Sequence, residues 1–122
     1  MITGAHVLFY SGNPEADRAF FRDILHLPSV DAGRGWLIFK LPPAEAALHP
    51  ADGEFKSHQA MLPTQFYLMC DDLQSLIKSL EVYKVSCTPV AQERWGMRTT
   101  IKLPSGGEIG LYQPSHPTAL NL

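Results

Sequence analysis

The same order of secondary-structure signals occurs twice along this chain of 122 residues. Residues 5–10 have the apolar character of a strand, and Asn13-Pro14-Glu15 then supplies an N-cap, a proline at the first helical position and an early acid. Apolar residues at helical spacing follow until Pro28, which ends the helix. Three short segments bounded by glycine or proline, at residues 29–31, 36–41 and 45–49, complete a predicted βαβββ module of about residues 2–50.

The pattern restarts after residues 51–62, which lack a clear period and are predicted to connect the two halves. Residues 65–70 are predicted to form a strand, and Asp71 is expected to cap the helix that follows it. Three further strands are predicted at about residues 86–90, 95–103 and 108–112. The second module therefore spans about residues 63–114, with a tail at residues 115–122.

A turn that occurs in both halves supports a duplication. Lys40-Leu41-Pro42 returns as Lys102-Leu103-Pro104, each time after a strand-like segment. Such a repeat favours a single domain, residues 1–122, built from two tandem modules. The alternative is one ferredoxin-like α+β domain whose halves resemble one another by chance.

The strand alternation divides the expected sheet into two faces, because neighbouring side chains of a strand point to opposite sides. One face is almost wholly apolar and is predicted to pack beneath helix residues such as Phe20 and Leu76. This apolar face comprises Val7, Phe9, Leu37, Phe39, Leu41, Leu48, Phe66, Leu68, Cys70, Ile109 and Leu111. The other face mixes polar and aromatic groups and is predicted to line a ligand cavity. This mixed face comprises His6, Leu8, Tyr10, Trp36, Ile38, Lys40, Ala47, His49, Gln65, Tyr67, Met69, Arg98, Thr100, Lys102, Glu108, Gly110 and Tyr112.

The composition excludes several classes of partner. The net charge is -2 and the 10 Lys and Arg residues are scattered, so no basic patch for nucleic acid or an anionic membrane is expected. No apolar run approaches the roughly 18 residues of a membrane span, and no signal peptide is visible. Cys70 and Cys87 lack metal or redox spacing, which fits free thiols in the cytoplasm. The partner expected from these features is a small molecule.

Two stretches resemble a known superfamily. The first strand carrying His6, then Asn13, then the sequence of residues 20–25, resembles the opening of vicinal oxygen chelate proteins, and residues 103–111 resemble their closing turn and strand. The resemblance to this glyoxalase, bleomycin-resistance and dioxygenase superfamily implies an α+β fold. In that fold, two tandem βαβββ modules form a curved mixed sheet around a cavity, with the helices outside. Related proteins close their cavities with a second subunit, and short modules leave sheet edges open, so a homodimer is expected.

The resemblance also implies where a metal would bind. Family enzymes take ligands from the first and last strands of each module, and His6 and Gln65 stand at the first-strand positions. The last-strand positions hold Ala47 and Gly110 where the family has glutamate. Both expected glutamates are therefore absent.

A displaced metal site remains a hypothesis at this stage. His49 and Glu108 stand two residues from the expected positions, so with His6 and Gln65 they would bind Zn, Fe(II), Mn or Ni, with Glu108 as the catalytic base. The alternatives are that His6 is a hydrogen-bonded cavity residue, that His49 lies at a strand end in solvent, and that Glu108 is a hairpin charge. The other histidines, His26, His58 and His116, are expected at the surface.

Three functions remain open on the sequence alone. The first is a metal-dependent lyase, isomerase or dioxygenase of the glyoxalase type. The second is a metal-free protein that binds an antibiotic or metabolite, as bleomycin-resistance proteins do, and the missing glutamates favour it. The third is a partner-binding module without a ligand. The predicted ligand contacts are Tyr10, Trp36, Gln65, Tyr67, Trp95, Arg98 and Tyr112, although the tryptophans would equally serve packing and Arg98 would equally lie in solvent.

Overall fold

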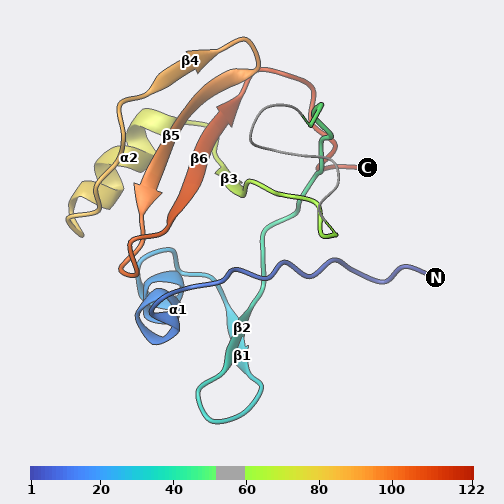
Figure 1. Ribbon diagram of the computed structural model, residues 1–122. Helices are drawn as coiled ribbons and strands as arrows, with labels where there is room; N and C mark the ends of the chain where they lie inside the picture. The colour runs from blue at the N-terminus through green and yellow to red at the C-terminus, as the bar shows by residue number, and fades with distance from the viewer. Residues whose placement is uncertain (52–59) are drawn as a thin grey trace.

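A computed structural model of the chain describes residues 1–51 and 60–122, so most of the predicted connection at 51–62 lies outside the described residues. The described strands form a four-stranded sheet and a two-stranded hairpin. Figure 1 shows a helix against the larger sheet, with another helix and the hairpin beyond its end. The helices are α1 (Pro14–Asp23) and α2 (Leu73–Glu81). The strands are β1 (Ser29–Asp31), β2 (Leu37–Phe39), β3 (Tyr67–Met69), β4 (Ala91–Glu93), β5 (Gly96–Lys102) and β6 (Glu108–Pro114).

The second half has the βαβββ order that the sequence predicts. Its four strands lie in the order β3-β6-β5-β4, with β3 parallel to β6 and the other neighbours antiparallel. The longest ladder joins β5 to β6, from the pair Gly96 and Pro114 to the pair Lys102 and Glu108. A parallel pair needs a long crossover, and α2 with β4 and β5 supplies it between β3 and β6. The prediction of a mixed α+β sheet is confirmed.

Two local expectations in this half are wrong. The second strand lies at Ala91–Glu93 rather than at 86–90, where Cys87 forms only an isolated bridge with Ile101. Asp72, not Asp71, caps α2, because its carboxylate stands where it accepts the backbone N–H of Ser75 at 3.1 Å and the hydroxyl of the same residue at 2.8 Å.

The first half forms only part of its predicted module. The helix is capped as expected, since the Asn13 side chain accepts the backbone N–H of Ala16 at 3.3 Å. Strands β1 and β2 pair as an antiparallel hairpin, from Ser29 opposite Phe39 to Asp31 opposite Leu37. Residues 5–10 and 45–49 belong to no strand, so these two predictions are wrong.

The reason is the absence of backbone partners for these two segments in the part of the chain that the structure describes. A strand exists only where its N–H and C=O groups meet a neighbouring ladder, and side-chain alternation does not provide one. Pro42, Pro43 and Pro50 flank the second segment and cannot donate a hydrogen bond, which disfavours its addition to a sheet.

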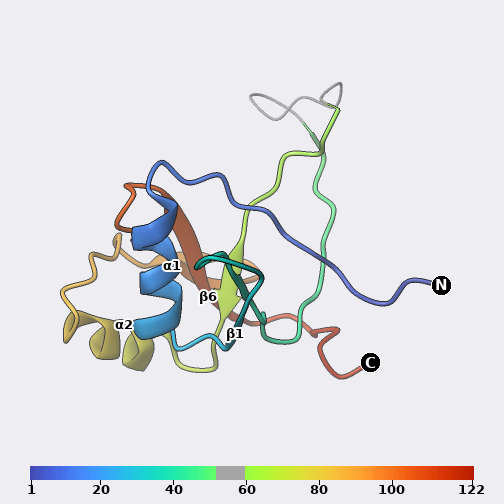
Figure 2. The same ribbon diagram turned by 90° about the horizontal axis from the view of Figure 1, so that it is seen from below.

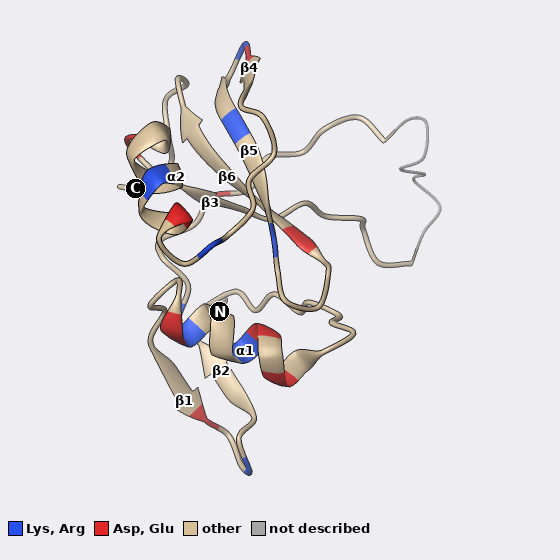
Figure 3. Cartoon of the chain, turned by 90° about the vertical axis from the view of Figure 1, so that its left-hand side faces the viewer, with Lys and Arg blue, Asp and Glu red and all other residues tan. Residues whose placement is uncertain are grey.

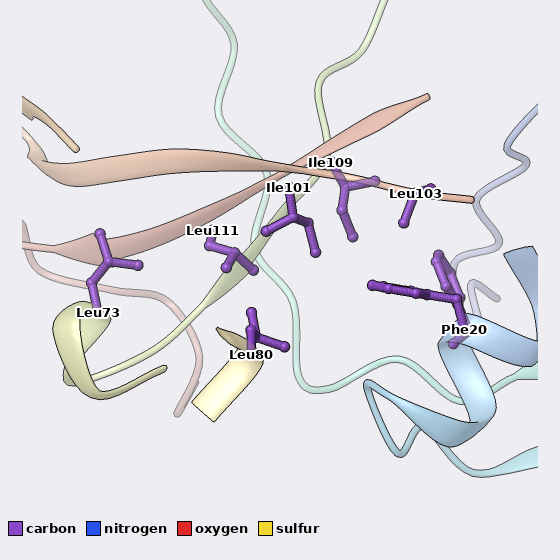
Figure 4. Packing of buried hydrophobic residues seen from close by; sticks show 8 residues of the cluster. Phe20, Leu73, Leu80, Ile101, Leu103, Ile109 and Leu111 are labelled. Atoms are coloured by element: carbon purple, nitrogen blue, oxygen red, sulfur yellow. The ribbon is translucent and has the colours of Figure 1, made fainter. Parts of the chain in front are cut away.

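One apolar core joins the two halves. It contains Phe20, Phe21, Leu73, Leu80, Ile101, Leu103, Ile109 and Leu111. Figure 2 shows α1 and α2 on the same side of β6, and Figure 4 shows Phe20 of α1 and Leu80 of α2 directed at the same face of the sheet. The face of β6 that packs against the helices is therefore the apolar face predicted from the sequence. Leu76 of α2 packs at the margin of this core. Leu48, which was predicted on the same face, is 88% exposed because its segment is not in the sheet.

The charges of residues 1–51 and 60–122 show no concentration of one sign along the elements. Figure 3 shows acidic and basic residues interspersed on α1 and α2, and both signs on the long strands and hairpins. None of the described helices is long and apolar enough to cross a membrane.

Candidate functional site

The predicted mixed face is divided between two places in the structure. Tyr67, Trp95 and Tyr112 form an aromatic cluster on the four-stranded sheet, whereas His6 and Trp36 line a cleft in the first half. Tyr10, predicted with them, is 95% exposed and does not line the cleft.

The three rings of the aromatic cluster meet edge to face. Ring centroids are 5.7 Å apart for Tyr67 and Tyr112, 5.1 Å for Trp95 and Tyr112, and 6.3 Å for Tyr67 and Trp95. The register brings them together, because Tyr67 of β3 lies opposite Gly110, two residues before Tyr112 on β6. Such contacts stabilise ring pairs beyond the burial of their area.

Gly110 is the residue on which the Tyr67 ring lies. A β-carbon at position 110 would stand 2.0 Å from Cδ1 of Tyr67 and 2.3 Å from its Cε1, closer than atoms can approach. Glycine is therefore required here for the close approach of the ring to the backbone. Position 110 is also where the superfamily resemblance places a metal-binding glutamate, so the Tyr67 ring occupies the space that such a side chain would need.

The other predicted metal ligands are not grouped. His6, His49 and Glu108 are all exposed, and Glu108 lies opposite Lys102 in the β5–β6 ladder. Gln65 instead accepts a hydrogen bond of 3.1 Å from the Tyr67 hydroxyl. Across residues 1–51 and 60–122, no three His, Cys, Asp or Glu side chains stand close enough to hold one ion. The donor set of the described chain thus does not fit the predicted metal.

Arg98 is engaged on the same face of the sheet. Its guanidinium contacts the carboxylate of Glu93, with Nη2 3.2 Å from Oε1. Because this partner offsets its charge, Arg98 is less suited to a ligand anion than the sequence suggested.

The tail after β6 folds back onto the aromatic cluster. The Tyr112 hydroxyl is hydrogen-bonded to Nε2 of His116, and the Ser115 N–H donates to the Trp95 carbonyl at 2.9 Å. The Glu45 carboxylate lies 3.9 Å from Nε2 of His116 and accepts the Ala119 N–H at 2.8 Å. Burial, and the nearby Glu45 charge, raise the pKa of Tyr112. His116 is partly exposed, with 30% of its side chain accessible, but its contact with Tyr112 was not predicted, because nothing in the local sequence signals it.

The cleft has the size of a small-molecule site. Its volume is about 540 Å³, and it lies between the N-terminal segment, α1 and β2. Its lining includes His6, Phe9, Arg18, Trp36, Ile38 and Lys40. The strand alternation placed His6, Leu8, Trp36, Ile38 and Lys40 on the cavity face. The same cleft is also lined by residues that it placed on the opposite, apolar face, namely Val7, Phe9, Leu37, Phe39 and Leu41.

Arg18 is the cleft residue that sequence reasoning missed. It is not among the predicted ligand contacts, but its guanidinium carbon stands 4.6 Å from the centroid of the Trp36 ring. Pro14, Arg18 and Phe21 follow one another at spacings of four and three residues and all line the cleft. The helical spacing alone puts Arg18 on the same side of α1 as Pro14 and Phe21. Arg18 could therefore have been predicted as a cleft residue if the segment containing Trp36 had been placed against that side of the helix.

Neither cysteine has the character of a catalytic nucleophile. Cys70 and Cys87 are free and half-buried, and burial raises the pKa of both thiols. A raised pKa lowers the fraction of reactive thiolate.

Comparisons with known proteins agree on the fold. No family model matches the sequence, and no curated protein matches it. Solved structures do match over nearly the whole chain. The lactoylglutathione lyase of Agrobacterium tumefaciens is 18% identical, with 91% of this chain and 92% of that one covered and a TM-score of 0.63.

Two further matches show the range of proteins with this architecture. TnmS3, an antibiotic-binding protein from a Streptomyces species, is 21% identical, with 94% of this chain and 99% of its own covered and a TM-score of 0.65. A superfamily member from Sphaerobacter thermophilus is 18% identical, with coverages of 92% and 98% and a TM-score of 0.58. The chain has the glyoxalase, bleomycin-resistance and dioxygenase fold, which is the vicinal oxygen chelate fold that the sequence resemblance implied.

Proposed function

We propose that this protein binds a small organic molecule in the cleft of its first half, without a metal ion. The observation that carries the proposal is the cleft, which has a volume of about 540 Å³ and a mainly apolar lining. Trp36 lies in its wall and is 60% exposed. Ligand sites are typically concave and apolar, with a few polar groups that orient the ligand. Trp36 would supply a flat contact surface, and His6 a hydrogen-bonding group.

Two findings support the absence of a metal from this function. Glycine at position 110 provides no ligand side chain where the superfamily resemblance places a glutamate, and His6, His49 and Glu108 are not grouped. Lyase, isomerase or dioxygenase chemistry through a metal therefore has no donor set among the described residues. TnmS3, which has the same fold, is described as an antibiotic-binding protein, so the fold is used for binding.

The aromatic cluster has a structural role in this proposal. Tyr67, Trp95 and Tyr112 contact one another, and the tail packs beside Tyr112. Rings that already pack edge to face have less free surface for a ligand than Trp36. The cluster would fix the tail and the sheet rather than contact the ligand.

A second copy of the chain and a cytoplasmic location are part of the proposal. The exposed apolar residues Leu8, Leu48 and Met61, at 65%, 88% and 85%, provide surface for a homodimer. Two free cysteines without metal or redox spacing fit a reducing compartment. Sedimentation equilibrium would detect the dimer, and a monomer at all micromolar concentrations would contradict it.

Fluorescence titration with N-phenyl-1-naphthylamine tests binding in the cleft. This neutral aromatic probe brightens in apolar sites, and we expect saturable binding by the native protein. Trp36→Ala should weaken binding, because it removes the flat contact surface in the cleft. Val30→Ala, which truncates another exposed apolar side chain of the same hairpin away from the cleft, is the matched control. Equal binding by both variants would refute the assignment of the site.

A further inference from the structure

The charged side chains of the cleft differ in whether they already have hydrogen-bond or ion-pair partners. Asp17 is already engaged: its Oδ2 accepts the Ser11 hydroxyl at 2.7 Å, and its Oδ1 accepts the Ser105 N–H at 3.0 Å. By contrast, none of the hydrogen bonds or ion pairs found among residues 1–51 and 60–122 involves the side chain of Arg18 or Lys40. Both of these cations line the cleft. The net unpaired charge at its wall is therefore positive.

Arg18 is held in place by the ring of Trp36. The guanidinium carbon lies 4.6 Å from the ring centroid, which is within the range of a cation–π contact. That contact uses the charge of the guanidinium but not its five N–H donors. Arg18 is half-buried, so an anion bound there would be less screened by water than at an open surface. The side chain is thus pre-positioned with free donors.

The apolar part of the wall selects the rest of the ligand. Phe9, Trp36 and Ile38 contribute aromatic and aliphatic surface to the same cleft. A small inorganic anion would leave this surface in water, whereas a neutral apolar molecule would leave the two cations unpaired. Only a molecule with both an apolar body and an acidic group meets both parts of the wall.

We infer that the cleft takes an apolar organic acid, with a flat hydrophobic body against Trp36 and a carboxylate or sulfonate held by Arg18 and Lys40. The inference rests on the proposed function and adds the class of ligand. Arg18 would act as the specificity-determining residue, because a guanidinium can hold both oxygens of one acid group.

A matched pair of probes tests the acidic class of ligand separately from the position of the binding site. 8-Anilinonaphthalene-1-sulfonate carries the same arylamine body as N-phenyl-1-naphthylamine and adds one sulfonate. We expect the sulfonate probe to bind more tightly and its affinity to fall with ionic strength. Arg18→Gln should weaken binding of the sulfonate probe about tenfold, the usual effect of losing one charge-assisted hydrogen bond, and leave the neutral probe unchanged. Lys40→Gln should act in the same direction.

Lys78→Gln is the matched control, since it removes the same charge from the exposed face of α2, outside the cleft. Thermal unfolding of each variant shows that it is folded. Equal affinities for the two probes, or equal effects of Arg18→Gln and Lys78→Gln, would overturn the inference while leaving the cleft as a binding site. If Trp36→Ala alters the binding of neither probe, the proposed function fails as well.

Discussion

Gly110→Ala tests the contact between the Tyr67 ring and the backbone of β6. The new β-carbon would lie 2.0 Å from Cδ1 and 2.8 Å from Cγ of Tyr67. The ring would have to retreat by about 1.5 Å to reach an ordinary van der Waals separation. Overpacking of this kind costs about 1 to 3 kcal/mol. The ring would also lose its edge contacts with Trp95 and Tyr112, each worth about 0.5 to 1.5 kcal/mol.

Two features limit the cost of this substitution. Tyr67 is half-buried, so its ring can swing toward solvent instead of distorting the sheet. Alanine in a strand is also favoured over glycine by about 0.5 to 1 kcal/mol. We therefore expect Gly110→Ala to lower the free energy of unfolding by about 2 kcal/mol. Urea unfolding followed by far-ultraviolet circular dichroism measures this quantity, and the near-ultraviolet spectrum reports the aromatic cluster.

A double-mutant cycle with Tyr67→Ala isolates the contact. If the ring is the obstacle, Gly110→Ala should be neutral or slightly stabilising in the Tyr67→Ala background. Thr100→Ser, a small change on the paired position of β5, is a suitable control for general effects on the ladder. Equal destabilisation by Gly110→Ala with and without the Tyr67 ring would refute the reasoning, and so would its having no effect in the native background.

Three further predictions concern the core, a helix cap and the metal. Phe20→Ala should cost about 3 to 5 kcal/mol and Leu76→Ala less, because Phe20 is 9% exposed whereas Leu76 lies at the margin of the core; equal costs in urea unfolding would contradict this packing. Asp72→Asn should destabilise more than Asp71→Asn at neutral pH. The Ser75 N–H lowers the pKa of Asp72, so its stabilisation is present above the unfolded-state pKa and is lost as pH falls through the folded one; a pH titration of stability checks this sign. Zn, Ni, Mn or Fe(II) should leave the melting temperature of the metal-free protein unchanged, and a rise that His6→Ala abolishes would restore the displaced metal site.

The sequence predicts the parts of the fold that rest on local chemistry. Asn13 and Pro14 identify the start of α1, and the alternation around Ile38 and Ile109 identifies strands and their buried faces. The turn at 104–107 is similarly local, because Gly106 adopts a φ of 94° that glycine accommodates without strain. Each of these signals lies within a few residues of the structure it specifies.

The features that could not be predicted depend on distant partners. Residues 5–10 have the composition of a strand but find no ladder among the described residues, and a sequence pattern does not contain that information. His116 meets Tyr112 and Glu45 only because the tail folds back. The absence of a glutamate at position 110 was visible in the sequence, but the Tyr67 ring that lies on Gly110 belongs to another strand.

The two tryptophans allow one measurement to test the central claim. Trp36 lines the cleft and Trp95 belongs to the aromatic cluster, so each candidate site carries its own indole N–H signal in a ¹⁵N–¹H correlation spectrum. Titration of metal-free protein with 8-anilinonaphthalene-1-sulfonate should shift the indole signal of Trp36 progressively to saturation and leave that of Trp95 in place. A saturable shift of Trp95 with Trp36 unmoved would contradict the account, because the ligand would then lie on the aromatic cluster and not in the cleft.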